Sequence, residues 1–477
     1  FIEKTSRFCV FVQHVRQKVY IAYYVSRHRI RYITMMIMKR LTLPLVVLLL
    51  SSLTSLSIAE TKNIIASFGT IDYRALSCRR YLSEHWRGSP ELYAEKADMY
   101  TCHLGAAEKV QQIKKIRPDL TCLLYRNIRE VYQSASEYQG FINNGWLLKD
   151  MNGNYIVTNY ATNRMVDVGS SNYQQWLANW IKGYLDQYGF DGAYLDNCLP
   201  SRGMLWGLTS EPINPRTGKP WTDQEFKEAV ITLVNKVKDT VAPKLVIGNG
   251  IFNGEAFFGS RYQNYVELLN SGIDGVMSEG WVSEWSSAEW YSEEEWLASI
   301  DFVVWLEDNF LPKGKIFIPV CANAASGNLP LGCSKEQYAA YCYASLLLAA
   351  RTSGAHYVNF YYYMVEDYPQ SLFTIDVGTP SAKYYVVPGT HVYARDFTKS
   401  KVLVNPTSQP YTINLTGQYQ TLNGTPITSP ITLKPHTGTI LKKVADNAPY
   451  AKVFIEHPSR GHLVVDIGIG ETPGANY

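Results

Sequence analysis

Residues 173–197 read YQQWLANWIKGYLDQYGFDGAYLDN, and this stretch decides the fold. From Tyr173 to Tyr188, apolar side chains recur three and four residues apart, which is typical of an amphipathic helix. A short apolar run follows at Phe190–Leu195 and ends on Asp196 and Asn197. A helix that leads into a buried strand is part of the repeating unit of parallel sheets. The stretch therefore predicts an α/β protein.

The same alternation of strand and helix repeats along most of the chain. Short apolar runs predict strands at Asn63–Phe68, Asp98–Cys102, Leu120–Tyr125, Phe190–Leu195, Leu245–Gly248, Ile273–Met277, Lys315–Val320 and His356–Tyr361. Amphipathic stretches predict helices at Ala106–Ile116, Tyr173–Tyr188, Phe226–Val241, Ala288–Phe310 and Gln337–Thr352. Eight parallel strands over about 300 residues fit a (β/α)8 TIM barrel. A doubly wound sheet is the alternative, but no GxGxxG motif follows the first predicted strand.

The pattern changes after Asp376. Short alternating strands, separated by Gly, Pro, Asn and Thr, are predicted at Val392–Phe397, Lys401–Val404, Tyr411–Leu415, Ile431–Leu433 and Gly438–Lys442. They are typical of a small antiparallel β-sandwich, which we expect to pack on the barrel. The predicted divisions are an N-terminal extension (1–34), a signal peptide (35–59), a catalytic (β/α)8 barrel (60–376), a β-domain (377–445) and a tail (446–477).

The residues before the barrel carry the pattern of a signal peptide. Lys39 and Arg40 form a positive region, Leu41–Leu50 is a short apolar region, and Ser51–Ala59 is rich in small residues. We expect cleavage before Glu60 and export to the cell surface or extracellular space, with no stable membrane insertion afterwards. An uncleaved anchor is the alternative, although Ser and Thr dilute the apolar stretch.

Composition excludes several classes of protein. With 45 Lys and Arg against 42 Asp and Glu, the net charge is only +3, so electrostatics give no case for nucleic-acid binding. A hydrophobic fraction of 46% indicates a globular chain rather than a disordered one. Eight cysteines are present, but no CxxC or HxxxH pair accompanies them, which argues against a zinc site. We expect no cofactor.

Two predicted strands end in carboxylates. The fourth closes DGAYLD at Asp196 and the sixth closes DGVMSE at Glu279, and active sites of TIM barrels form at these strand ends. One carboxyl group can protonate a glycosidic oxygen while the other attacks the sugar carbon or activates water. Alternatively, Asp196 caps the next segment or pairs with an Arg, and Glu279 is a solvated loop acid. Asp191 and Asp274, which open the two strings, are predicted to be structural turn residues.

Other polar and aromatic side chains near the strand ends are candidates for substrate binding. Aromatic faces stack on sugar rings, and polar groups bind the hydroxyls. The candidates are Asp72, Tyr125, Arg126, Asp150, Asn197, Asn249, Trp281, Trp285, Asn323, Tyr361 and Glu366. For Trp285 and its neighbours, packing of a helix against the barrel is the alternative interpretation.

Several strings in the chain resemble hypothetical glycosyl hydrolase family fifteen. They are WLLKDMNGNYI (146–156), VDVGSSNYQQWLANWI (166–181), GFDGAYLDN (189–197) and DGVMSEGW (274–281). The closing VYARDFTKSKVLVNP and LKPHTGTIL resemble the β-domain that often trails such barrels. The resemblance implies a (β/α)8 glycosidase in which Asp196 is the nucleophile or base and Glu279 the proton donor.

Three functions remain open at this point. The leading hypothesis is an exported glycoside hydrolase that acts on a poly- or oligosaccharide without a cofactor. The second is a non-catalytic carbohydrate-binding or cell-surface protein, because a fold does not imply a function. The third is a metal-assisted hydrolase of another ester or amide, for which His103 and His356 are the histidines near predicted strand ends.

Overall fold

The computed structural model describes residues 76–444, except 85–87, 159–160, 203–207, 285–288, 322–328, 330–331 and 362, and the backbone of four further strands. Strands β1 (Phe11–Val15) and β2 (Lys18–Ala22) pair in an antiparallel hairpin within a separate unit, Phe1–Ile71. In the predicted tail, β22 (Tyr450–His457) and β23 (Gly461–Gly468) pair in the same way. The predicted signal peptide and the strand expected at Asn63–Phe68 lie outside the described residues.

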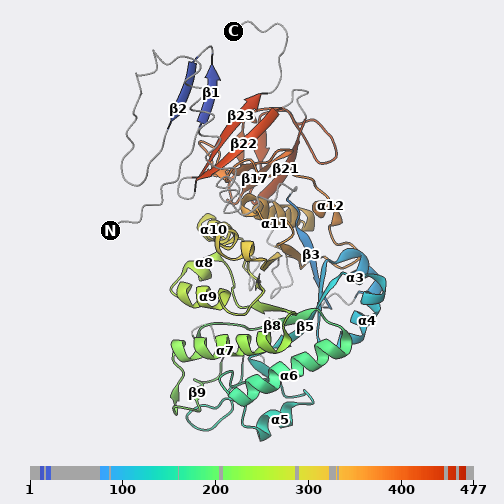
Figure 1. Cartoon of the computed structure of the whole chain (residues 1–477), viewed down its shortest axis with the longest axis vertical. Coiled ribbons are helices and arrows are strands. Elements are labelled where there is room, and N and C mark those ends of the chain that lie inside the picture. Colours follow the sequence, from blue (N-terminus) through green and yellow to red (C-terminus); the bar gives the residue numbers. More distant parts are fainter. Residues whose placement is uncertain are drawn as a thin grey trace, which may run out of the picture. The chain divides into compact units, whose positions relative to one another are not determined.

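Among the described residues, eight parallel strands close into a barrel in the order β3-β4-β5-β8-β11-β12-β13-β14, and β14 pairs with β3 (Figure 1). The strands are β3 (Arg79–Ser83), β4 (Met99–Cys102), β5 (Thr121–Asn127), β8 (Gly192–Asp196), β11 (Leu245–Asn249), β12 (Gly275–Ser278), β13 (Ile316–Cys321) and β14 (Tyr357–Phe360). The predicted TIM barrel is therefore confirmed.

The first barrel strand corrects the prediction. It is β3, RRYLS, and not the more apolar run at Asn63–Phe68. Because two of its five residues are arginines, this strand does not stand out in a hydrophobicity pattern. Both arginines form hydrogen bonds in the structure: Arg80 Nε donates to Asp98 at 2.8 Å, and Arg79 donates to the Tyr357 hydroxyl at 2.6 Å. Only tertiary contacts of this kind make such a sequence acceptable in a barrel.

Helices cover the outside of the barrel (Figure 1). The longer ones are α3 (Pro90–Lys96), α4 (Ala107–Ile116), α6 (Ser171–Tyr188), α7 (Asp223–Val241), α9 (Tyr262–Leu269), α10 (Glu293–Asn309) and α11 (Lys335–Ala349). The five predicted helices are confirmed, although α10 begins later than expected. Its start is set by Ser292, which forms a capping box with Glu295.

Shorter elements occupy the connections. They are η3 (Leu104–Ala106), β6 (Glu130–Tyr132), α5 (Tyr138–Asn143), β7 (Asn163–Met165), β9 (Ile213–Asn214), β10 (Lys219–Pro220), α8 (Gly254–Phe258), η5 (Leu311–Lys313) and α12 (Gln370–Phe373). Several of these lie in the long segments after β5 and β8, at the C-terminal end of the barrel strands. Long loops at this end commonly carry function.

Side-chain alternation along the strands decides which residues face the barrel interior. Tyr194 belongs to the interior cluster, so Asp196, two residues later, lies on the same face at the C-terminal end of β8. Asp191 lies at the opposite end, where it accepts from the Cys122 N–H at 2.7 Å. Asp274 likewise accepts from the Val246 N–H at 2.9 Å. Both are structural, as predicted.

The chain continues into an antiparallel β-domain. In its described part, a five-stranded sheet runs in the order β15-β16-β17-β21-β19, and β18 pairs with β20. The strands are β15 (Tyr385–Val386), β16 (Tyr393–Asp396), β17 (Ser400–Asn405), β18 (Tyr411–Ile413), β19 (Tyr419–Gln420), β20 (Ile431–Leu433) and β21 (Thr437–Lys443). Val392, Leu403, Ile413, Leu433 and Leu441 share one apolar cluster between the two sheets. This is the arrangement of a small sandwich.

Helix α11 joins the barrel to the β-domain. Gly438 of β21 lies so close to it that an added Cβ would be 2.5 Å from the Ala340 carbonyl oxygen. The buried Arg395 donates to the carbonyls of Leu347 and Ala350 at the C-terminal end of α11, where a helix lacks its own donors. The β-domain therefore packs on the barrel, as expected.

A buried carboxylate ties α10 to the segment before β14. Glu307 accepts from His356 Nε2 at 2.8 Å and from the Thr352 hydroxyl at 2.6 Å. Burial raises the pKa of Glu307, but the hydrogen bonds from His356 and Thr352 outweigh it and lower the pKa to about 2. The ionised form of Glu307 is therefore the one that stabilises the fold.

This carboxylate leads to a prediction about acid stability. Since the folded pKa lies below the ordinary value of 4.5, its contribution is present above pH 4.5 and is lost as the pH falls towards 2. The loss is about 3 kcal/mol. Glu307→Gln is expected to lower the unfolding free energy at pH 7 by about 3–5 kcal/mol, measured by urea denaturation. Glu294→Gln, at an exposed position of α10, is the control. Equal stability of the two variants would refute this role.

Candidate active site

Asp196 ends β8, and three donors converge on its carboxylate. The Tyr125 hydroxyl donates to Oδ2 at 2.6 Å, and the Asn249 side-chain amide donates to Oδ1 at 2.9 Å. The backbone N–H of Asn197 also donates to Oδ1, at 2.8 Å. Tyr125 comes from β5 and Asn249 from β11, the two strands that pair with β8. The register of the barrel thus brings these groups together.

The backbone turns sharply after Asp196. Asn197 has φ 57°, in the left-handed region that Asn adopts more readily than most residues. This turn lets its N–H point back to the carboxylate one residue earlier. The local sequence Asp-Asn therefore both ends the strand and supplies a donor to the acid.

Glu279 follows β12, the next strand but one. The Asn249 side chain, which donates to Asp196, also interacts with the Glu279 carboxyl and lowers its pKa. Behind Glu279 the chain is fixed by the Gly280 N–H, which donates to the Phe252 carbonyl at 3.1 Å. A Cβ at Gly280 would lie 2.7 Å from the Phe252 ring, so a larger residue here would have to displace that ring. One amide therefore bridges two half-buried carboxyl groups from the fourth and sixth barrel strands.

The two carboxyl groups have unequal surroundings. Burial raises the pKa of Glu279 to about 8, the nearby charge of Asp196 adds to the rise, and the Asn249 hydrogen bond opposes it. Burial also raises the pKa of Asp196, against the hydrogen bonds from Tyr125, Asn249 and Asn197 and the charge of Arg129. With more donors, Asp196 is the better site for the negative charge. Near neutral pH the proton therefore stays on Glu279.

Of the other predicted site residues, Tyr125, Asn197 and Asn249 contact Asp196 directly. Tyr361, just after β14, packs against the cluster inside the barrel, at the same end of the strands. These residues came from reading the strand ends, and the barrel brings their side chains to one end.

Three further predicted residues, Arg126, Asp150 and Glu366, have other surroundings. Arg126 is on the outer face of β5, because Tyr125 faces inward; its guanidinium lies 4.6 Å from the Trp180 ring and pairs with Glu137 at 2.8 Å. Asp150 accepts from the Asn154 N–H at 2.9 Å and forms a turn. Glu366 is exposed.

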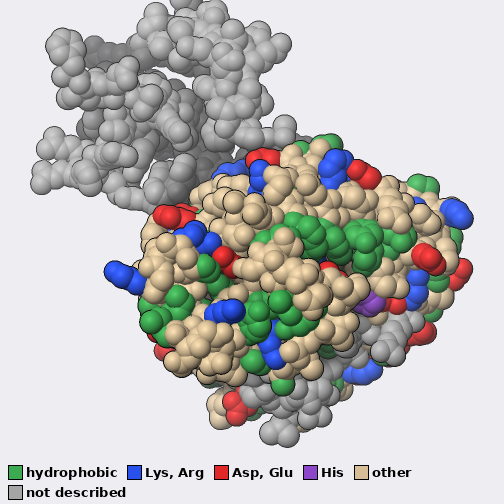
Figure 2. Space-filling model, turned by 90° about the horizontal axis from the view of Figure 1, so that it is seen from below, with side chains coloured by type: hydrophobic (Ala, Val, Ile, Leu, Met, Phe, Trp, Pro, Cys, Tyr) green, Lys and Arg blue, Asp and Glu red, His purple; other side chains and the backbone are tan. Residues whose placement is uncertain are grey.

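Figure 2 views the side on which α5, α6 and α7 lie and shows hydrophobic side chains gathered in bands there.

Trp281 also corrects the prediction. It is 0% exposed and belongs to the main core, so its ring does not present a face to a ligand. Alternation explains this: Met277 faces the barrel interior, and the turn at Glu279 and Gly280 directs the next indole into the helix layer. The remaining candidates Asp72, Trp285 and Asn323 lie outside the described residues.

Sequence reasoning missed Tyr194 and Arg129. Tyr194 lies on the same face of β8 as Asp196, and alternation alone could have found it. Arg129, 2% exposed, forms an ion pair with Glu130 and lowers the pKa of Asp196. Adjacent residues of opposite charge after a strand look like a surface pair in the sequence, so no pattern indicated the burial of Arg129.

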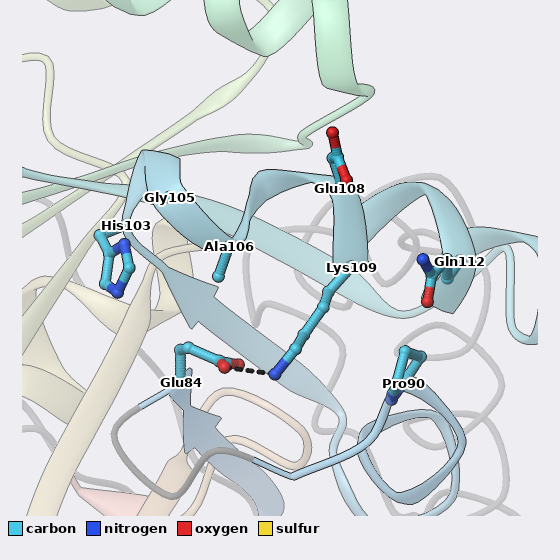
Figure 3. A pocket seen from close by; sticks show the side chains of 8 residues that line it. All are labelled: Glu84, Pro90, His103, Gly105, Ala106, Glu108, Lys109 and Gln112. Carbon is cyan, nitrogen blue, oxygen red and sulfur yellow. Dashed lines mark hydrogen bonds and ion pairs between the residues drawn. The ribbon is translucent and has the colours of Figure 1, made fainter.

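A cavity of about 550 Å³ lies at the C-terminal ends of β3 and β4 (Figure 3). It is lined by Glu84, Pro90, His103, Gly105, Ala106, Glu108, Lys109 and Gln112. Figure 3 shows Glu84 and Lys109 pointing toward one another, and they form an ion pair. The Tyr100 hydroxyl also donates to Glu84, at 2.5 Å. The cavity therefore lies at the rim of the barrel, with Glu84 and Lys109 bound to one another.

The histidines of the metal hypothesis do not come together. His103 lines the rim cavity, whereas His356 is fully buried against Glu307. Within the described ranges, no group of three His, Cys, Asp or Glu side chains is arranged to hold a metal ion.

No helix in the described ranges has the length and apolar character needed to cross a membrane.

A closed barrel with two interacting carboxyl groups at the C-terminal ends of its fourth and sixth strands defines a glycoside hydrolase-like TIM barrel. The chain belongs to Hypothetical glycosyl hydrolase family 15, whose model matches residues 114–401. This confirms the resemblance seen in the sequence. The family implies a carbohydrate substrate.

Solved structures share the barrel at low sequence identity. An alpha-amylase from Lactobacillus plantarum is 12% identical, with a TM-score of 0.47 over 77% of this chain and 99% of that chain. The glycoside hydrolase domain of PelA from Pseudomonas aeruginosa is 11% identical, with a TM-score of 0.39 over 63% and 97%. Similarity at this level says nothing about the reaction. A comparison with curated proteins finds no match.

Proposed function

We propose that the protein is an exported glycoside hydrolase that cleaves O-glycosidic bonds of a poly- or oligosaccharide with Asp196 and Glu279. The observation that supports this most directly is the carboxyl pair bridged by Asn249. The two groups interact, yet their surroundings favour opposite protonation states. Glycoside hydrolysis requires one carboxylic acid and one carboxylate at the same bond.

In the proposed reaction, Glu279 gives its proton to the leaving oxygen as the bond to the sugar breaks. Asp196 either attacks the anomeric carbon or removes a proton from an attacking water. Tyr125 and Asn249 hold the Asp196 carboxylate in one orientation, and their hydrogen bonds keep it ionised. The stereochemistry of the first product, observed by NMR, decides between direct attack and activation of water.

Export is part of the proposal and rests on the pattern of Lys39–Ala59. The charged, apolar and small-residue regions occur in the order that a signal peptide requires. Expression of the full chain in a secreting host, followed by N-terminal sequencing of the product, tests it. A mature chain that starts at Glu60 supports cleavage, and a product that retains the Leu41–Leu50 region contradicts it.

The pH dependence of the reaction tests the assignment of acid and base. Glu279 must be protonated, so kcat/KM is expected to fall as the pH rises through about 8. Asp196 must be ionised, so the rate is also expected to fall on the acid side, below a pKa that lies above the ordinary value for Asp. A bell-shaped profile of kcat/KM on a panel of glycans, measured from pH 3 to 10, is the expected result.

The same panel distinguishes the alternative function. A non-catalytic carbohydrate-binding protein would bind one of the glycans without releasing any product. If binding is found without turnover, and Asp196→Asn leaves the affinity unchanged, the enzymatic proposal is wrong. A profile that does not change between pH 6 and 10 would instead contradict the role of Glu279 as the acid.

A further inference from the structure

The loop after Glu279 contacts the β-domain through the ring of Trp290. Trp290 stacks on His436, with ring centroids 4.5 Å apart and an interplanar angle of 4°. Tyr341 of α11 contacts the indole edge to face at 4.9 Å, and Tyr338 lies at 5.7 Å. The indole is therefore held between a helix of the barrel and a residue of the β-domain. Stacked aromatic pairs of this kind add to the stabilisation that comes from the area they bury.

The two ends of this loop are connected to one another. Ser283 and Trp290 pair as antiparallel backbone neighbours. The Tyr291 hydroxyl donates to the Gly280 carbonyl at 2.7 Å and accepts from Asn253 at 2.8 Å. A shift of Trp290 therefore displaces Tyr291, which contacts the residue next to Glu279. Residues 285–288 lie outside the described part of the chain.

His436 is itself rigidly placed. It lies between β20 and β21 with φ 46°, and its N–H donates to the Thr407 carbonyl at 3.1 Å. Its carbonyl accepts from Gln337 of α11 at 3.1 Å. Burial lowers the pKa of the imidazole to about 4, so the ring is neutral at physiological pH. The contact with Trp290 is thus a fixed stack of two uncharged rings.

We propose that His436 is a positioning residue, through which the β-domain holds the loop that carries Glu279 in its catalytic orientation. This role rests on the proposed function of Glu279. It gives the β-domain a part in the reaction beyond covering α11. The chain of contacts runs from His436 to Trp290, then through Tyr291 to Gly280, and each step is a direct ring contact, chain neighbour or hydrogen bond.

The interface offers a matched control. The Tyr384 hydroxyl donates to Asp301 of α10 at 2.6 Å, so this contact also joins the β-domain to the barrel helices. It involves none of the residues between Glu279 and Tyr291. Tyr384→Phe loosens the interface without touching the loop, whereas a change of His436 acts on the loop directly.

The experiment compares His436→Asn, His436→Phe and Tyr384→Phe in the full chain. Asn accepts a positive φ but removes the ring, and Phe restores an aromatic ring for the stack. For His436→Asn, kcat is expected to fall about tenfold with KM within about twofold of the wild type, because small misplacements of a catalytic group act on the chemical step. The Gly280 amide is expected to exchange its hydrogen faster. Tyr384→Phe is expected to match the wild type in both measurements. His436→Phe keeps the stack but is strained at this positive φ, so it is expected to lie closer to the wild type than His436→Asn does.

Two results overturn the proposal. One is a kcat for His436→Asn equal to that of Tyr384→Phe. The other is unchanged hydrogen exchange at Gly280 in His436→Asn. The exchange measurement needs no substrate, so it tests the positioning of the loop separately from the reaction. If Glu279→Gln turns over glycans as fast as the wild type, the proposed function fails, whatever the exchange rates show.

Discussion

Asp196→Asn is expected to lower kcat/KM by about 10⁴-fold, because the neutral amide can neither attack the anomeric carbon nor accept a proton from water. The replacement has the same shape: its oxygen can still accept from Asn249 and the Asn197 N–H, and its amide group can donate to the Tyr125 hydroxyl oxygen. The thermal midpoint is therefore expected to change little. The measurement is steady-state hydrolysis of the best glycan of the panel, together with thermal unfolding of each variant.

The control for this change is Asp191→Asn, on the same chain segment at the other end of the barrel. Asp191 pairs with Lys114 at 2.6 Å and accepts from the Cys122 N–H. Its replacement is expected to reduce stability while kcat stays close to that of the wild type. Comparable activities for the Asp196 and Asp191 variants would show that Asp196 does not act on the substrate.

Glu279→Gln is expected to lower kcat about 10²- to 10⁴-fold on a natural glycan, because the leaving oxygen then departs without a proton. An aryl glycoside with a strongly acidic leaving group needs no such proton, so the loss on that substrate is expected to be much smaller. The fall of kcat/KM through pH 8 is expected to disappear as well, since Glu279 is the group that titrates there. Both substrates can be measured in the same assay.

Glu366→Gln is the matched control. Glu366 is also a glutamate near the end of a predicted strand, but the structure leaves it exposed after β14. Its replacement is expected to change neither rate. If Glu279→Gln impairs the activated and the natural substrate equally, the residue is not the acid, and a role in binding the sugar or in holding Asn249 replaces it.

The carboxyl pair shows how far sequence reasoning reaches. A strand has a period of two, so a carboxylate that closes the run GAYLD lies at the barrel mouth whenever Tyr194 faces inward. Asp196 could be placed in this way without any tertiary information. Its partners Tyr125 and Asn249 follow from the same rule applied to β5 and β11. The pKa values of the pair could not be predicted, because they depend on burial and on Asn249 bridging both groups.

For two of the predicted site residues, the direction of the side chain made the prediction wrong. Arg126 ends the same strand as Tyr125, yet it is one residue out of phase and therefore lies on Trp180 outside the barrel. Trp281 follows Glu279 closely but turns into the core. The first strand escaped notice because Asp98 and Tyr357 compensate its arginines from other parts of the chain.

The sequence alone determined the class of fold and placed two carboxyl groups at strand ends, because periodicity and strand order are local properties that can be read without knowledge of contacts. Only the tertiary structure decided which acid holds the proton, since desolvation and hydrogen bonding depend on neighbours distant in the chain. It also brought Trp290 against His436, residues from different domains, through the packing of β21 on α11.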